Sequence, residues 1–188
     1  GPIKRRSIHY ELGDVSGTLG TTLPNTTGLK LQTNSVAAGV TEFLRPEDGS
    51  WDPSNPADFY FVTTDRFDNL KNGGNTSGTN VGRSRLWKMH FSDITNPTAG
   101  GTITMLLDGT EAHQMLDNMT IDEHGRVMLQ EDPGVNEFAA RIWTYHLGTG
   151  TLTQVFTHNP TIFGDRVAST TTLPRSGFTN DEESSGIL

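Results

Sequence analysis

Two parts of this chain carry the same series of strand-like segments, and this repeat restricts the fold more than any other feature. The matched pairs are Phe59–Thr64 with Arg126–Gln130, Leu86–Phe91 with Ile142–Leu147, and Thr102–Leu107 with Leu152–Thr157. The segments are rich in β-branched and aromatic residues, as strands are. The clearest match is Arg-Leu-Trp at 85–87 against Arg-Ile-Trp at 141–143. A repeated unit of short strands is typical of β-propeller blades.

An acidic segment precedes each series, and we interpret it as the first strand of a four-stranded unit. Leu44–Gly49 opens the first unit, Leu116–Met119 opens the second, and Asp181–Leu188 provides a third opener. We therefore predict an all-β chain that is a β-propeller or a propeller fragment built of four-stranded blades. Residues 1–40 are expected to form an irregular segment with short strands, and residues 41–188 about two blades plus the first strand of a third. A propeller closes with at least four blades, so the missing ones are expected from other sequence or from partner chains.

The composition excludes several classes of protein. Fourteen Lys and Arg stand against 22 Asp and Glu, so the net charge of −8 argues against a nucleic-acid partner, which needs a basic surface. No run of about eighteen apolar residues is present, so we predict no membrane span. The chain has no Cys, which excludes disulfides, thiolate metal sites and cysteine nucleophiles.

The acidic openers predict a metal site, because the first strands of propeller blades line the central channel. The residues expected to converge there are Glu47, Asp48, Asp117, Asn118, Glu182 and Glu183, with Glu131 and Asp132 closing a second strand. Carboxylates at this density repel one another unless cations intervene. Hard oxygen donors suit Ca²⁺, with the Asn118 amide as a neutral ligand, and Arg45 is a planar fork suited to phosphate. Acidic residues in β-turns are often simply solvated, and that interpretation stays open for any single segment.

Other types of catalytic site have weaker support in the sequence. The six histidines show no metal-binding spacing, so we interpret them as surface or turn residues. No nucleophile elbow, phosphate-binding loop or dinucleotide-binding turn occurs. Ser184 and Ser185 carry hydroxyls within the third opener, but the sequence indicates no histidine partner for either.

Several of these segments resemble one bacterial enzyme family. They are Arg45–Pro53, Phe59–Thr64, Arg85–Trp87, Asp117-Asn118, Glu131-Asp132 and Asp181–Gly186. Together they are similar to the C-terminal half of PhoX-type alkaline phosphatases, from about residue 40 to the end of the chain. Those are exported β-propeller enzymes that hydrolyse phosphate monoesters with calcium and iron. The Arg-Pro-Glu-Asp-Gly element at 45–49 is the most specific part of the resemblance.

The resemblance implies roles for individual residues. Arg45 would contact the phosphate of an ester substrate, Glu47 would bind metal, and the later acidic pairs would supply further ligands for Ca²⁺ and Fe³⁺. It also implies a periplasmic or extracellular location. The family site additionally uses an N-terminal half with a Cys iron ligand, and this chain has no Cys.

Two functions are therefore carried forward from the sequence. The first is metal-dependent hydrolysis of phosphate monoesters, as part of a larger propeller whose missing half or partner chain completes the site. The alternative is a non-catalytic, calcium-stabilised extracellular propeller that acts as a scaffold or assembly subunit. The sequence leaves open whether the chain is itself an enzyme.

Overall fold

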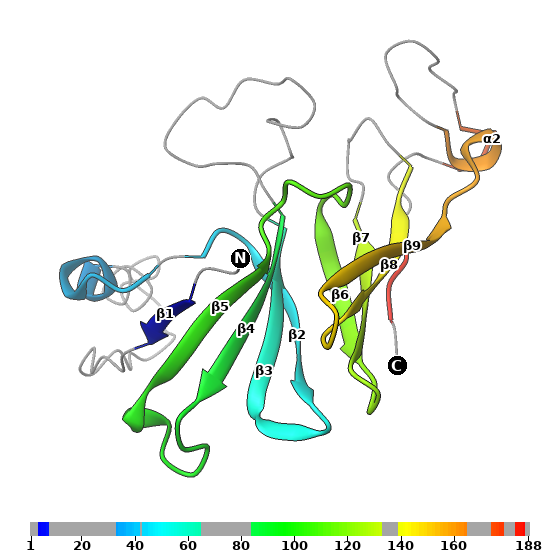
Figure 1. Cartoon of the computed structure of the whole chain (residues 1–188). Coiled ribbons are helices and arrows are strands. Elements are labelled where there is room, and N and C mark those ends of the chain that lie inside the picture. The colour runs from blue at the N-terminus through cyan, green and yellow to red at the C-terminus, as the bar shows by residue number, and fades with distance from the viewer. Residues whose placement is uncertain are drawn as a thin grey trace.

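The computed structural model of this chain contains two antiparallel sheets that lie next to each other (Figure 1). The residues that the structure describes are 4–7, 33–41, 43–64, 84–132, 139–164, 174–178 and 183–186. Strands dominate these residues, which confirms the mostly-β class expected from the period-two patterns.

The first sheet has five strands, of which four form a consecutive meander. In order across the sheet they are β1 (Lys4–Ser7), β5 (Gly101–Leu107), β4 (Arg85–Phe91), β3 (Asn55–Thr63) and β2 (Pro46–Asp52). A short 3₁₀ helix, η1 (Pro97–Ala99), connects β4 to β5. The strand β1 pairs with the outer edge of β5, so β2 and β1 are the two edge strands of this sheet.

The second sheet is a four-stranded meander. Its strands, in chain and sheet order, are β6 (Leu116–Ile121), β7 (Arg126–Glu131), β8 (Arg141–His146) and β9 (Thr151–Thr157). The turn between β6 and β7 uses Gly125 at φ 73°, a backbone conformation that favours glycine. A one-turn helix, α2 (Pro160–Phe163), follows β9 and is capped by the Asn159 side chain, which accepts from the amide of Thr161.

The strand registers of the two meanders are similar. Trp87 lies opposite Phe61 in the first sheet, and Trp143 lies opposite Leu129 in the second. The predicted alignment of residues 102–107 with residues 152–157 is wrong by one residue. Trp87 pairs with Met105, whereas Trp143 pairs with Gln154 and not with Val155. Val155 and Phe156 are adjacent apolar residues beside an irregular register, so their pattern did not determine the alignment.

The same unusual backbone geometry begins both units. Arg45 and Met115 have φ of 54° and 41°, and they are the non-glycine residues with positive φ in the described part of the chain. The carbonyl of Arg45 accepts from the amide of Thr64, and the carbonyl of Met115 accepts from the amide of Asp132. A register irregularity follows in each first strand, after Pro46 in β2 and after Leu116 in β6.

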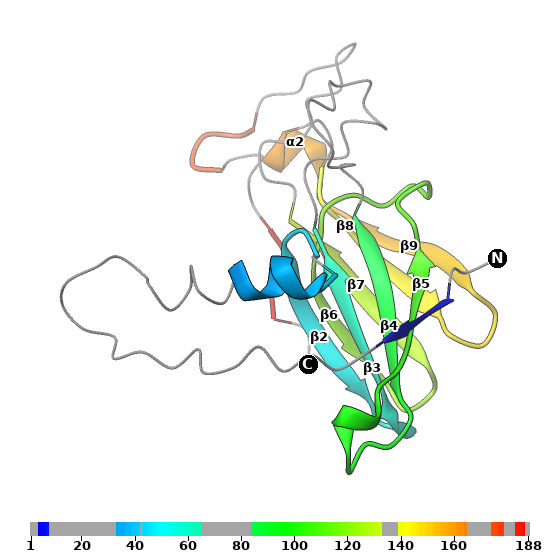
Figure 2. The same ribbon diagram turned by 90° about the vertical axis from the view of Figure 1, so that its left-hand side faces the viewer.

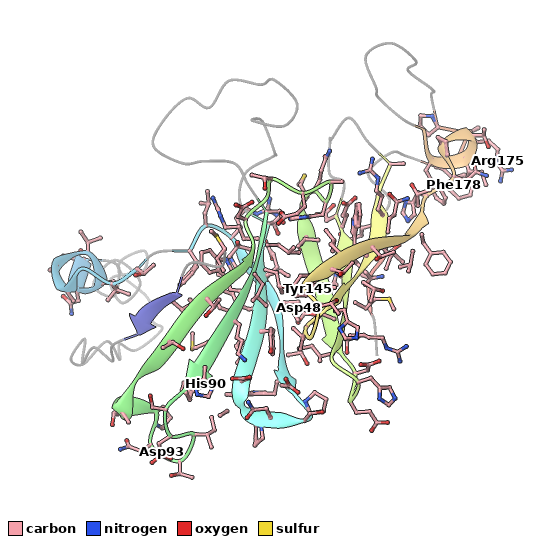
Figure 3. All side chains as sticks on the ribbon, in the orientation of Figure 1. Asp48, His90, Asp93, Tyr145, Arg175 and Phe178 are labelled. Carbon is pink, nitrogen blue, oxygen red and sulfur yellow. The ribbon has the colours of Figure 1, made fainter. Side chains whose placement is uncertain are left out.

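The hydrophobic core lies between the sheets, which pack through β2, β3 and β6. Its buried members are Tyr60, Val62, Leu86, Leu107, Leu116, Met119, Ile121, Val127, Leu129, Trp143 and Tyr145. Figure 3 shows Tyr145 and Asp48 in the space between the two sheets. The strands β1 and β9 are the edges that lie away from the contact between the sheets, and the sheets form no closed ring within the described residues (Figure 2).

Buried hydrogen bonds lock the two sheets together at one end. The hydroxyl of Thr64 donates to the carbonyl of Leu116 over 2.8 Å, and the amide of Leu116 donates to Ser84 Oγ over 2.7 Å. The amide of Met119 donates to Asp48 Oδ2 over 3.0 Å, from the second sheet to the first. These bonds fix the start of β6 relative to β2, and therefore the relative positions of the two acidic openers.

Some local expectations were wrong or fall outside the described residues. A helix occupies residues 33–38, within the segment expected to be irregular with short strands. Residues 69–82 are rich in Gly, Asn and Thr and are therefore expected to form a loop, but they lie outside the described residues. Among the described helices, none is long and apolar enough to cross a membrane.

Candidate functional site

Asp117 is the centre of a group of charges at the end of the sheets where β2 and β6 begin. Burial, together with the negative charges of Glu47, Asp132 and Glu183, raises the pKa of Asp117 to about 6, against the opposing charge of Arg45. We name the four carboxylates Glu47, Asp117, Asp132 and Glu183 the acidic cluster. It contains residues from all three predicted openers.

The pictures agree with this convergence. In Figure 2 the segment 183–186 lies on the same side of the molecule as β2 and β6, and in Figure 1 it lies beyond β6, next to β8 and β9. The openers therefore follow one another along one side of the two sheets, as the repeat predicted. Glu182, the other acidic candidate of the third opener, lies outside the described residues.

Arg45 is held at the cluster by its backbone and by an ion pair. Its Nε lies 3.3 Å from Glu47 Oε1, and the two side chains are 44% and 31% exposed. The bond from the Thr64 amide to the Arg45 carbonyl anchors the main chain at this point. The guanidinium is therefore positioned beside the carboxylates and still reaches solvent, where an anionic ligand can meet it.

Asp48 and Asn118 occupy equivalent positions but make different contacts. Asp48 accepts from the amide of Gly49 through Oδ1 over 2.7 Å and from the amide of Met119 through Oδ2 over 3.0 Å. The Asn118 amide donates to Asp117 Oδ2 over 2.9 Å. Asp48 thus connects the two sheets, and Asn118 supports the central carboxylate of the cluster.

The Glu131 side chain, at the end of β7, is buried and hydrogen-bonded within the fold. It is 3% exposed, and its carboxylate accepts from the amides of Gln114 and Arg141 and from Trp143 Nε1 over 2.7, 3.0 and 2.7 Å. Burial raises the pKa of Glu131 to about 7, against the opposing effect of these donors. In the first sheet the equivalent Trp87 Nε1 donates to Thr63 Oγ1. The predicted ligand Glu131 therefore supports the packing of Trp143.

A histidine–serine pair was missed by sequence reasoning. His158 Nε2 lies 2.9 Å from Ser184 Oγ, although the two residues are 26 positions apart. His158 directly follows β9, and Ser184 belongs to the third opener. No spacing rule connects these positions. The repeat could have found the pair only through the expectation that the third opener lies next to the second sheet.

A second charged group lies away from the cluster, on β3 and β4. The buried carboxylate of Asp58 lies 2.6 Å from His90 Nδ1 and forms an ion pair with Lys88. It also accepts a hydrogen bond from the side-chain amide of Asn55 over 2.9 Å. Lys88 also lies over the ring of Tyr60. Figure 3 shows His90 on β4, towards the end of the strand opposite the cluster. These contacts satisfy Asp58 within the fold.

The donor chemistry of the acidic cluster fits a hard cation, but its geometry is open. Four carboxylates and one amide carbonyl are the oxygen donors that Ca²⁺ prefers. Among the described residues, however, no three His, Asp or Glu side chains are already arranged to hold one metal ion. Binding would require these side chains to move towards a shared ion.

Comparisons with known proteins leave this site to be interpreted from its own residues. No family model, no curated protein and no solved structure matches the chain.

Proposed function

We propose that this chain forms two neighbouring blades of a β-propeller and contributes the acidic cluster and Arg45 to a metal-dependent phosphomonoesterase site. The observation that carries the proposal is the gathering of Glu47, Asp132 and Glu183 around Asp117, with Arg45 beside them. The resemblance of these same segments to PhoX-type alkaline phosphatases supports the reaction, and with it a periplasmic or extracellular location.

The way in which the sheets pack supports the propeller. Leu129 and Trp143 of the second sheet are buried against the first, and their equivalents Phe61 and Trp87 lie on the other face of the first sheet. Phe43 packs edge-on against both of these rings. Each unit therefore repeats the same faces in the same direction, which favours addition of further blades until a ring closes.

A cation would remove the mutual repulsion of the acidic cluster. Glu47, Asp117, Asp132 and Glu183 would hold Ca²⁺, and Asn118 orients Asp117 through its hydrogen bond. A bound cation would polarise the phosphoryl group and lower the pKa of an attacking water. The Cys ligand that the resemblance implies for iron is absent from this chain.

Arg45 would bind the phosphate and stabilise the charge that develops during hydrolysis. Its guanidinium offers paired N–H donors to phosphate oxygens, and its contact with Glu47 leaves other donors available. Removing one such interaction from a transition state typically costs about 10²- to 10³-fold in rate. The exposed position of Arg45 allows a soluble ester to approach.

A combined binding and turnover experiment tests the proposal. Calcium should raise the melting temperature of the chain, because a ligand at a hundredfold excess over Kd adds about 2.7 kcal/mol of stability. Glu47→Gln should lose this effect, and Glu123→Gln, on the exposed β6–β7 turn, should retain it. Hydrolysis of p-nitrophenyl phosphate that EDTA abolishes would support the enzyme.

The second candidate is a non-catalytic propeller stabilised by calcium. It is favoured by Asp48 and Glu131, two acidic residues of the predicted site whose oxygens accept N–H groups within the fold. Stabilisation by calcium without turnover, when the chain is combined with the sequence that completes the ring, would identify this function. Absence of any calcium effect would refute both candidates.

A further inference from the structure

The His158–Ser184 pair lies at the same end of the molecule as the acidic cluster. His158 follows the end of β9, where Thr157 pairs with Arg141 and the Arg141 amide donates to Glu131. Ser184 directly follows Glu183, whose charge raises the pKa of Asp117. The hydroxyl is therefore one residue from the cluster in which the phosphate is proposed to bind.

The imidazole of His158 is held in place from several sides. Its amide donates to the carbonyl of Ala140 over 2.8 Å, and its ring lies 4.7 Å from the ring of Phe163 on α2. Phe163 in turn packs edge-on against Phe178, whose ring is covered by the guanidinium of Arg175 at 5.1 Å. Figure 3 shows Phe178 and Arg175 beside α2. This stack limits rotation of the imidazole away from Ser184.

The geometry of the pair is that of a hydroxyl and its general base. A serine oxygen is a weak nucleophile until a base within hydrogen-bond distance accepts its proton. The 2.9 Å between Ser184 Oγ and His158 Nε2 meets this requirement, with the hydroxyl donating in the tautomer that carries its proton on Nδ1. Ser184 is partly exposed, so a substrate can reach it.

We infer that Ser184 is a nucleophile towards phosphorus esters and that His158 is its general base. The inference rests on the proposed function for its substrate class. Ser184 Oγ forms a bond to phosphorus and its proton passes to His158 Nε2. The bond from phosphorus to the leaving oxygen breaks with the electron pair on that oxygen, which takes the proton from His158 and leaves the imidazole neutral again. Water then gives a proton to His158 and attacks phosphorus, and Ser184 Oγ leaves and takes that proton back.

A fluorophosphonate probe tests the nucleophile without requiring a metal or turnover. Attack by Ser184 would form an Oγ–P bond and release fluoride, which leaves a mass adduct on the peptide that contains Ser184. We expect Ser184→Ala to remove the adduct and His158→Gln to slow its formation at least tenfold. The matched controls are Ser185→Ala, the exposed neighbouring hydroxyl, and His124→Gln, on the β6–β7 turn. Both should be labelled like the unmodified chain.

The outcomes separate this inference from the proposed function. Labelling that survives Ser184→Ala would overturn the assignment of Ser184 as the nucleophile. So would the absence of labelling in the unmodified chain when its melting temperature shows that it is folded. Chelator-sensitive phosphatase activity that Ser184→Ala leaves intact would also overturn it, with the proposed function still standing. Labelling at Ser184 that depends on His158, with no phosphatase activity when the chain is combined with the sequence that completes the ring, would support the pair and refute the phosphatase.

Discussion

Replacing Glu131 with glutamine tests whether a buried carboxylate makes the folded chain sensitive to pH. Glu131 is 3% exposed and receives three N–H donors, one of them from Trp143. Glutamine has the same shape and keeps one acceptor oxygen, but it does not titrate. The variant therefore removes the ionisation of this side chain and changes the packing little.

The size of the effect follows from the pKa of Glu131. Burial raises it from 4.5 to about 7, so the folded chain binds this proton more tightly than the unfolded chain. The free energy of unfolding should therefore fall as the pH rises through that interval. Each tenfold change in proton affinity corresponds to about 1.4 kcal/mol, which gives a total loss of about 3 kcal/mol above pH 7.

Urea denaturation between about pH 4.5 and 7.5, in the presence of EDTA, measures this loss. Asp117 is raised to about pKa 6 and contributes in the same direction, but it is present in both chains, so the difference between them isolates Glu131. Glu123→Gln, at an exposed carboxylate, is the control. A difference between Glu131→Gln and the unmodified chain that stays constant with pH would refute the assigned burial of a charged group.

Four further substitutions test the packing, each by urea denaturation. Trp143→Phe should cost about 2–3 kcal/mol because it removes one of the three donors to a buried carboxylate, whereas Trp87→Phe loses a neutral bond and should cost about 1 kcal/mol; equal losses would contradict the geometry. Gly101→Ala should destabilise by more than about 2 kcal/mol, since its Cβ would lie 1.9 Å from the His90 carbonyl oxygen, and a neutral effect would exclude this close approach. Leu86→Ala should cost about 2–5 kcal/mol at a fully buried core position.

Sequence patterns predicted the strands and the repeat because both depend on local signals. Alternation and β-branched residues located the strands, and the two Arg-x-Trp segments aligned the units. The equivalence of the acidic openers followed from that alignment, and the electrostatic neighbours of Asp117 agree with it. The bound metal and the catalysed reaction stay predictions, because strand periodicity indicates neither of them.

The directions of individual side chains could not be predicted in the same way. A single extra residue in a strand reverses which face its neighbours occupy, and the register irregularity in β6 lies directly beside Asp117. Sequence therefore could not separate the inward Glu131 from Asp132, which follows it in the chain. The contact between His158 and Ser184 depends on how the third opener lies against the second sheet, which is a tertiary property.

The shared left-handed backbone at Arg45 and Met115 has a consequence for which side chain each unit can present there. Such a conformation costs a non-glycine residue roughly 1–2 kcal/mol, whichever side chain it carries. The main-chain shape therefore leaves the side chain at that point exchangeable. One unit carries a cation and the other a thioether. Chemistry at this end of the molecule can thus change by a single codon, with no need to rebuild the strand that carries it.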